Sequence, residues 1–338
     1  MQTALNLARS GFPMAMPNPL VGCVIVKDDK ILAEGYHEKY GAAHAEVNAI
    51  NNLNSEINPK DCILYVTLEP CSHFGKTPPC SDLIISKGFT KVILCNLDPN
   101  PLVAGKGVEK LKAAGIEVIT GVLEKEGREL NKRFFTFFEK KRPYFILKWA
   151  QTADGFISRL PVPEKREANK IGDDDQQKTV HQMRSEEMAV MVGKNTVLCD
   201  NPFLTTRLVN KKNPVRIFID KNLEVPLSFN IYNKEAKTLV FNNIKNDEKE
   251  NIKWIKINFS DEVLKQISEK LFNLNIQSVL VEGGTFLLNS FIAENLWDEA
   301  FIFVNENLKF DTGIKAPSIN FPHNFTKSGE LKLFKLKR

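Results

Sequence analysis

Two stretches decide the fold of the first half of the chain, HAE at residues 44–46 and PCSHFGKTPPC at residues 70–80. They contain one histidine, His44, followed at a distance by two cysteines, Cys71 and Cys80. Zinc takes four tetrahedral ligands, and a catalytic zinc site uses three protein ligands so that water can occupy the fourth position. His44, Cys71 and Cys80 are three such ligands. We therefore predict a catalytic site that binds one zinc ion.

Glu46 completes this pattern without being a ligand. It lies two residues after His44, at the start of an apolar run with helical spacing that includes Val47, Ile50 and Leu53. A glutamate in this place can take a proton from water and deliver it to a leaving amine. The order H-x-E, then P-C, then a further cysteine is that of hydrolytic zinc deaminases. We therefore predict that Glu46 is the catalytic residue of a deaminase.

Two other interpretations of these residues stay open. Free cysteines are most often plain core residues, so Cys71 and Cys80 could be unrelated. A structural zinc site would need a fourth protein ligand, and His73 lies two residues after Cys71. A structural site has no use for an acid beside an open position, so Glu46 distinguishes the two kinds of zinc site.

Length and composition indicate a globular protein of about two domains. The 338 residues are 43% hydrophobic and 26% charged, with 46 Lys and Arg against 41 Asp and Glu. Acidic and basic residues alternate, as in residues 245–250, so we expect no nucleic-acid partner. We expect neither a transmembrane helix nor a signal peptide. Six cysteines in so long a chain do not make a disulfide framework, which indicates a cytoplasmic protein.

The hydrophobic pattern predicts strands that alternate with helices, and thus an α/β layer sandwich. The predicted ligands fall at helix starts and strand ends, where such folds place their sites. In the first half we expect a helix in residues 1–12, a helix carrying Glu46, helices at 81–85 and 107–114, and strands at 21–26, 31–36, 62–67, 91–95 and 116–119.

A second domain is expected to begin near Pro143, after an aromatic helix at 131–138 and a linker at 140–143. The predicted domains are 1–142 and 143–338. In the second we expect an irregular polar stretch at 158–175, a helix at 176–187, and strands at 144–149, 188–192, 215–219, 238–241 and 278–281.

The last of these strands leads through Gly283 and Gly284 into an apolar helix. Glycines let the backbone approach a ligand closely, and the start of a helix offers N–H groups to a phosphate. This junction is therefore either a phosphate site or a tight turn.

Taken together, these motifs closely resemble the bifunctional deaminase/reductase family of riboflavin biosynthesis. The most specific part of the resemblance is the cysteine loop, which has eight residues between Cys71 and Cys80 where generic cytidine deaminases have two. The matching stretches are PNPLVG at 17–22, HAEV at 44–47, TLEPCSH at 67–73, GKTPPC at 75–80, DPNP at 98–101, VAGKG at 103–107, LNK at 130–132, KWAQTADG at 148–155, TVLCDNP at 196–202, LT at 204–205, Arg207 and VEGG at 281–284.

The resemblance implies a cytidine-deaminase-like three-layer domain followed by a dihydrofolate-reductase-like α/β domain. The first domain would hydrolytically deaminate 2,5-diamino-6-(5-phosphoribosylamino)pyrimidin-4-one with zinc. The second would reduce the ribosyl group of the product to ribityl with NADPH. The implied partner is thus a small phosphorylated pyrimidine, with no nucleic acid and no membrane, and a homo-oligomer stays an option.

The family's pattern also implies contact residues. In the deaminase, Asn18, His73 and Lys76 would hold the substrate, and Lys76 is a point charge suited to phosphate. The implied cofactor contacts of the reductase are Ala150, Thr196, Asp200, Gly284, Thr285, Phe286, Leu287, Leu288, Asn289 and Ser290. Its implied substrate contacts are Arg184, Leu204, Arg207 and Glu282. The two arginines can clamp a phosphate, and the alternative is ion pairing with neighbours such as Glu187.

Three rival functions were considered. A nucleic-acid deaminase would need a clustered basic face with exposed aromatic residues, which the dispersed charge does not supply. A binding protein stapled by zinc would make no use of Glu46. An enzyme in which one half alone is active is the third option.

Overall fold

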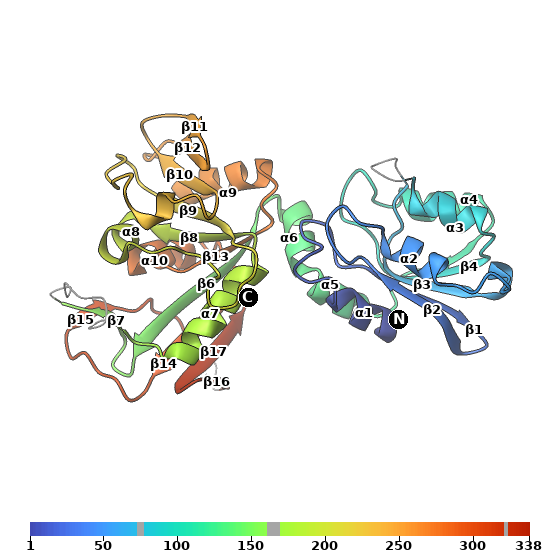
Figure 1. Cartoon of the computed structure of the whole chain (residues 1–338), viewed down its shortest axis with the longest axis horizontal. Coiled ribbons are helices and arrows are strands. Elements are labelled where there is room, and N and C mark those ends of the chain that lie inside the picture. The colour runs from blue at the N-terminus through green and yellow to red at the C-terminus, as the bar shows by residue number, and fades with distance from the viewer. Residues whose placement is uncertain (73–77, 161–169, 321–323) are drawn as a thin grey trace. The chain divides into compact units, whose positions relative to one another are not determined.

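The computed structural model describes residues 1–72, 78–160, 170–320 and 324–338 (Figure 1). The chain divides into two compact units, Met1–Lys141 and Arg142–Arg338, which are described separately below. His73, Lys76 and most of the stretch at 158–175 lie outside the described residues.

Unit 1 is built on a five-stranded sheet in the order β2-β1-β3-β4-β5. Strand β1 pairs antiparallel with β2 and β3, whereas β3, β4 and β5 are parallel to one another. Strands β1 and β2 form a hairpin, whose turn residues Asp28 and Asp29 have positive φ of 49° and 58°, as such a tight turn requires. The strands are β1 (Gly22–Lys27), β2 (Lys30–Tyr36), β3 (Ile63–Leu68), β4 (Lys91–Asn96) and β5 (Glu117–Ile119).

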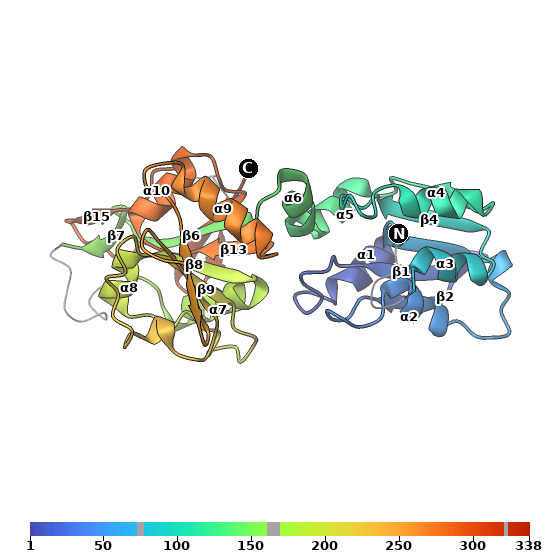
Figure 2. The same ribbon diagram turned by 90° about the horizontal axis from the view of Figure 1, so that it is seen from above.

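Helices cover both faces of this sheet. On one face α2 (Ala45–Asn51), α3 (Cys80–Ser86) and α4 (Lys106–Ala113) share a hydrophobic cluster with the strands. On the other face α1 (Gln2–Arg9) packs beside α5 (Glu124–Leu130), and α6 (Lys132–Lys140) follows (Figure 2). A short 3-10 helix, Pro59–Asp61, precedes β3.

A glycine in β2 lets α2 lie directly on the sheet. A Cβ atom on Gly35 would lie 2.3 Å from the backbone nitrogen of Ala49 in α2, so a larger residue would push this helix outward. The start of α2 carries His44 as its N-cap. The close packing at Gly35 therefore positions a predicted zinc ligand.

Unit 2 contains a ten-stranded sheet in the order β11-β12-β10-β9-β8-β13-β6-β14-β17-β16. The strands from β12 to β14 in this order are parallel, and antiparallel strands close both edges. Their bounds are β6 (Tyr144–Thr152), β8 (Ala189–Gly193), β9 (Val215–Ile219), β10 (Thr238–Asn242), β11 (Asp247–Lys249), β12 (Ile252–Lys256), β13 (Ser278–Val281), β14 (Glu299–Asn305), β16 (Thr326–Ser328) and β17 (Leu331–Lys337). A separate pair joins β7 (Phe156–Arg159) to β15 (Gly313–Lys315).

The two faces of the large sheet carry different helices. The main core of unit 2 includes α9 (Val263–Asn273) and α10 (Thr285–Ala293), together with Phe145, Leu147 and Trp149 of β6. The opposite face packs against α7 (Asp174–Glu186), while α8 (Lys194–Asp200) and the 3-10 helix Asn230–Tyr232 pack on a second cluster. Because side chains alternate along a strand, Lys148 of β6 belongs to the face of α7.

The predicted strands of both units are present, with boundaries shifted by at most a few residues. The prediction of an irregular stretch throughout 158–175 is wrong at both ends, because β7 extends to Arg159 and α7 begins at Asp174. The start of α7 is fixed by Asp173, whose side chain accepts a hydrogen bond from the Gln176 N–H, a cap overlooked in the sequence. Nine further elements were not predicted from the sequence: α5, α8, α9, β11, β12, β14, β15, β16 and β17.

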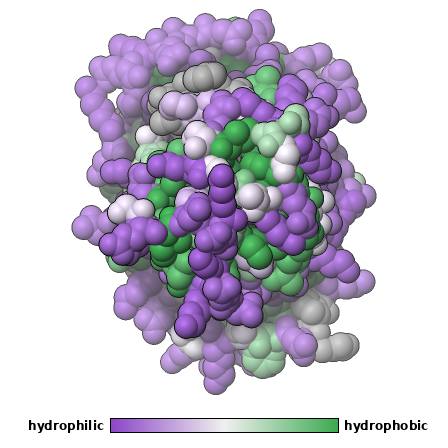
Figure 3. Space-filling model, turned by 90° about the vertical axis from the view of Figure 1, so that its right-hand side faces the viewer, coloured by the Kyte–Doolittle hydropathy of each residue, from purple (hydrophilic) through white to green (hydrophobic). Residues whose placement is uncertain are grey.

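Within the described ranges, none of the helices has the combined length and apolar character needed to cross a membrane. The face drawn in Figure 3 has a largely hydrophilic periphery around a hydrophobic central area.

Candidate active sites

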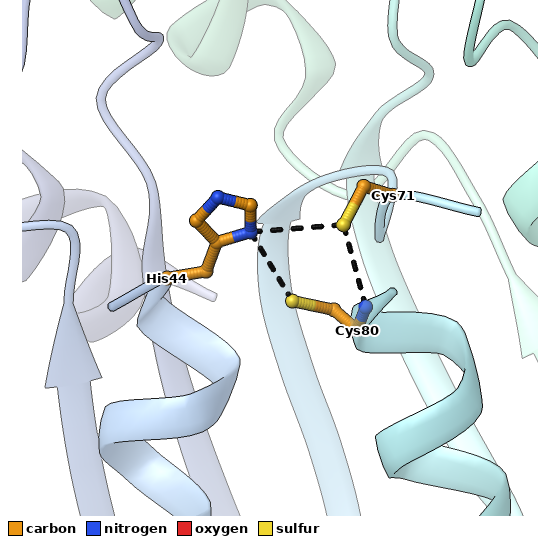
Figure 4. Close-up of side chains that lie close together, drawn as sticks. All are labelled: His44, Cys71 and Cys80. Carbon is orange, nitrogen blue, oxygen red and sulfur yellow. Dashed lines mark hydrogen bonds between the residues drawn. The ribbon is translucent and has the colours of Figure 1, made fainter. Parts of the chain in front are cut away.

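The three predicted zinc ligands lie together in unit 1 (Figure 4). His44 is the N-cap of α2, Cys80 is the first residue of α3, and Cys71 follows the end of β3. Their ligand atoms all lie within 4.8 Å of one another. His44 Nδ1 is 3.3 Å from Cys80 Sγ and 3.6 Å from Cys71 Sγ.

These distances fit a tetrahedral zinc ion. Zn–S bonds of about 2.3 Å and Zn–N bonds of about 2.0–2.1 Å at tetrahedral angles place the nitrogen and sulfur atoms about 3.6 Å apart. The observed separations of 3.3 and 3.6 Å agree with this value. One imidazole nitrogen and two thiols are also the donor set that zinc prefers.

Hydrogen bonds concentrate negative charge on Cys71. The hydrogen bond from the Cys80 thiol lowers the pKa of Cys71 to about 4, although burial opposes this shift. The Cys80 N–H also donates to Cys71 Sγ, over 3.3 Å. The bond between the two thiols raises the pKa of Cys80, and the bond to Cys71 raises that of His44. A cation that binds both sulfur atoms would replace the hydrogen bond between them and favour the thiolate form of Cys80 as well.

Glu46 is buried beside the ligands, with 4% of its surface exposed. Burial raises its pKa to about 7, although the charge of His44 opposes the shift. A carboxyl group with this pKa exchanges its proton readily near neutral pH, as an acid–base catalyst must.

A second histidine lies beside this cluster and was not singled out in the sequence. His37 Nδ1 is 2.9 Å from the backbone oxygen of Ala43, and its Nε2 is 3.0 Å from the side-chain amide nitrogen of Asn18. The ring of His37 packs edge-on against that of His44, with centroids 5.6 Å apart. Because Nδ1 faces a carbonyl, it carries the proton, and Nε2 accepts from Asn18. His37 thereby orients a predicted substrate contact.

Glu69 anchors the approach to Cys71 and was also missed. Its carboxylate is buried and accepts four backbone N–H bonds, from Asp98, Gly105, Gly107 and Val108. The last two amides belong to the start of α4. The carboxylate therefore ties the loop after β4 to the strand end that leads into Cys71.

In unit 2, two predicted substrate contacts, Arg184 and Glu282, form a buried charge cluster with Lys148. Glu282 accepts two bonds from Arg184, from Nε over 2.5 Å and from Nη2 over 2.8 Å. Lys148 Nζ lies 3.3 Å from the same carboxylate. Burial favours the neutral acid, but the charges of Arg184 and Lys148 outweigh it and lower the pKa of Glu282 to about 2. Glu282 is therefore a fixed negative charge.

The predicted cofactor segment surrounds the start of α10. Gly284 has a φ of +70°, and a Cβ on Gly283 would lie 3.0 Å from Thr196 Oγ1, so the glycines bring this turn close to Thr196. Phe286 is 88% exposed, whereas Leu287 and Leu288 are buried in the main core. The side chains of Thr285 and Ser290 donate to the carbonyls of Lys315 and Phe286, and Asn289 is exposed.

The remaining predicted contacts differ in exposure. Asp200 and Arg207 are exposed, and Ala150 is half-buried in β6. Leu204 is 3% exposed, and its side chain packs in the cluster beside α8. The ring of Phe286 is thus exposed at the start of α10, whereas Leu204, Leu287 and Leu288 direct their side chains into cores.

Family models match both units. The model for the cytidine and deoxycytidylate deaminase zinc-binding region matches residues 1–96, and the RibD C-terminal domain matches residues 143–306. The chain thus joins a zinc-binding deaminase domain to a reductase domain of an NADPH-using family.

Whole-chain comparisons are more specific. Riboflavin biosynthesis protein RibD of Aquifex aeolicus is 47% identical over 312 residues, which are 90% of this chain and 85% of that relative. The protein of the same name from Escherichia coli is 34% identical over 326 residues, 91% of this chain and 87% of the relative. A diaminohydroxyphosphoribosylaminopyrimidine deaminase/5-amino-6-(5-phosphoribosylamino)uracil reductase of Thermotoga maritima has a TM-score of 0.87 at 36% identity, and covers 100% of this chain and 97% of its own.

The chain belongs to the RibD family, the bifunctional deaminases and reductases of riboflavin biosynthesis. The predicted family, the two α/β fold classes and the pairing of a deaminase with a reductase are thereby confirmed.

Proposed function

We propose that His44, Cys71 and Cys80 hold the zinc ion of the deaminase and that Glu46 is its catalytic residue. The observation that carries this proposal is the agreement of the two nitrogen–sulfur separations, 3.3 and 3.6 Å, with tetrahedral zinc. When bound, zinc supplies a Lewis acid that lowers the pKa of water towards about 7. Among the described residues, the group that could hold a metal ion has three members, which leaves the fourth position of a tetrahedral zinc ion for water, as in a catalytic site.

Glu46 performs the proton transfers in this proposal. Its carboxylate takes a proton from the attacking water and donates it to the amine that leaves the pyrimidine ring. Asn18, oriented by His37, binds the substrate together with His73 and Lys76, the two predicted contacts outside the described residues.

We infer that residues 143–338 form the reductase and bind NADPH, which supplies the hydride. Thr196 and the segment Gly284–Ser290 contact the cofactor, together with Ala150 and Asp200. The positive φ of Gly284 and the open position of Phe286 support this placement. Leu287 takes part through its backbone alone, and Leu288 through packing, because their side chains are buried.

Arg184, Arg207 and Glu282 bind the reductase substrate, with Leu204 contributing its backbone. Glu282 holds the guanidinium of Arg184 by two hydrogen bonds, which orients it for a phosphate or hydroxyl group. The substrate is a small phosphorylated pyrimidine. A cytoplasmic location fits the six free cysteines. The oligomeric state stays open.

The test is NADPH oxidation by zinc-loaded protein supplied with 2,5-diamino-6-(5-phosphoribosylamino)pyrimidin-4-one. Glu46→Gln should abolish this oxidation, and oxidation should return when the variant receives the deaminated product. Glu56→Gln, an exposed glutamate of the same unit, is the control and should behave as the wild type. Oxidation by Glu46→Gln on the undeaminated substrate would contradict the proposed role of Glu46. No oxidation by the zinc-loaded wild type would contradict the two-step reaction.

A further inference from the structure

A buried histidine on α7 faces the loop that carries Arg207. His181 is 4% exposed, and its Nδ1 accepts a hydrogen bond from the backbone N–H of Leu208 over 3.3 Å. Leu208 directly follows Arg207, a proposed substrate contact. Neither the family pattern used above nor the sequence analysis assigns His181 a role.

The bond to His181 is one of three by which α7 holds this loop. Arg184 Nη1 donates to the backbone oxygen of Thr205 over 3.2 Å. Lys211 Nζ donates to the side chain of Gln182 over 3.0 Å. Arg207 therefore lies between two residues, Thr205 and Leu208, whose backbone groups are each bonded to a side chain of α7.

The geometry also fixes the state of the imidazole. A backbone N–H can only donate, so Nδ1 of His181 must be unprotonated and the proton of the neutral ring lies on Nε2. Burial, together with the nearby charges of Arg184 and Arg207, lowers the pKa of His181 to about 4, although Glu282 opposes the shift. The ring therefore stays neutral between two arginines that the substrate is proposed to contact.

We propose that His181 is a positioning residue of the reductase, which fixes the backbone beside Arg207 so that this arginine meets the substrate. The proposal rests on the proposed contact between Arg207 and substrate. A side chain that only packs in the core needs a suitable volume. A positioning residue here also needs a hydrogen-bond acceptor at the place of Nδ1, so the two roles can be distinguished.

Two amide variants separate these roles. His181→Asn keeps an acceptor near the position of Nδ1, whereas His181→Gln places its acceptor near the position of Nε2. We expect His181→Gln to raise the KM for the deaminated substrate about three- to tenfold, the effect of one lost hydrogen bond, with little change in kcat. His181→Asn should restore a KM near that of the wild type. Deaminase activity, carried by unit 1, should be unchanged in both. The fluorescence of the three tryptophans, which all belong to unit 2, reports that the unit containing His181 is folded.

Arg207→Met, alone and combined with His181→Gln, completes the test. We expect Arg207→Met to raise KM, and His181→Gln to add nothing further in its presence, because the positioned group is gone. Three outcomes would each overturn the positioning role and leave the Arg207 contact intact. The first is a wild-type KM for His181→Gln, and the second is an equal rise in KM in the Asn and Gln variants. The third is a double variant in which the effects of Arg207→Met and His181→Gln on KM are additive. A wild-type KM for Arg207→Met would refute the substrate contact itself, and the positioning role with it.

Discussion

Replacing Glu69 by glutamine should destabilise unit 1 alone. Oε1 of Glu69 accepts from the amides of Gly107 and Val108 over 2.9 and 3.2 Å, and Oε2 accepts from those of Asp98 and Gly105 over 3.2 and 3.0 Å. Glutamine keeps one of these oxygens and replaces the other by an NH2 group. Two buried N–H groups would then face a donor in place of an acceptor.

The size of the loss follows from these two amides. A buried donor left without an acceptor costs roughly 1–3 kcal/mol, so two of them cost about 2–6 kcal/mol of the free energy of unfolding. Glu109→Gln is a matched control, because Glu109 is an exposed residue of the same helix, α4. Its substitution should change the stability by less than about 0.5 kcal/mol.

Urea denaturation followed by two signals measures this loss. The three tryptophans, Trp149, Trp254 and Trp297, all belong to unit 2, so their fluorescence reports that unit, whereas circular dichroism reports both. Glu69→Gln should lower the midpoint of a circular-dichroism transition and leave the fluorescence midpoint unchanged. A loss below about 1 kcal/mol would show that the four amides do not depend on the carboxylate. A shift in the fluorescence midpoint would show that the loss is not confined to unit 1.

Three further substitutions test the buried charges. Burial raises the pKa of Asp98 in the folded protein to about 7. The protonated side chain therefore stabilises the fold fully below the pKa that Asp98 has in the unfolded chain, and this stabilisation is lost as the pH rises to about 7. The free energy of unfolding of Asp98→Asn, relative to that of the wild type, should therefore rise by about 2 kcal/mol between about pH 5 and pH 8. Urea denaturation followed by circular dichroism measures this difference. Arg216 is fully buried and donates to carbonyl oxygens of the loops around it, so Arg216→Met should cost about 3 kcal/mol or more and lower the fluorescence midpoint. Glu282→Gln should destabilise unit 2 by about 3–5 kcal/mol in the same assay, because Arg184 and Lys148 would lose their buried counter-charge.

The zinc cluster could be predicted from the sequence because its chemistry is written in short motifs. His44 and Glu46 are two residues apart, and both cysteines lie in one loop whose end begins a helix. The same holds for the strands of both units, whose apolar runs are continuous. Local pattern therefore predicted both the cluster of His44, Cys71 and Cys80 and the alternation of strands and helices.

The reductase site depends on contacts that no local pattern displays. Glu282, Arg184 and Lys148 come from three distant segments, and their side chains meet because β6 and β13 are neighbours in the sheet and α7 packs on one face. The resemblance marked Leu287 as a cofactor contact, but helical periodicity directs its side chain into the core. Strand β12 was missed because it is short and lysines interrupt its apolar residues. Helix α9 has apolar residues at helical spacing, Leu264, Ile267 and Leu271, so this signal was present and was overlooked.

Three buried glutamates show how surroundings divide one residue type into three roles. Burial raises the pKa of Glu46 to about 7, although the charge of His44 opposes the shift, and a carboxyl group with this pKa can carry a proton. Glu282 faces an arginine and a lysine that lower its pKa to about 2, so it remains ionised and holds the guanidinium of Arg184 by two hydrogen bonds. Glu69 is held by backbone amides and joins two segments of chain. Glu46→Gln should therefore abolish deamination, and Glu282→Gln should disorder the proposed reductase site. Glu69→Gln should destabilise unit 1, because each carboxylate is used for a different property.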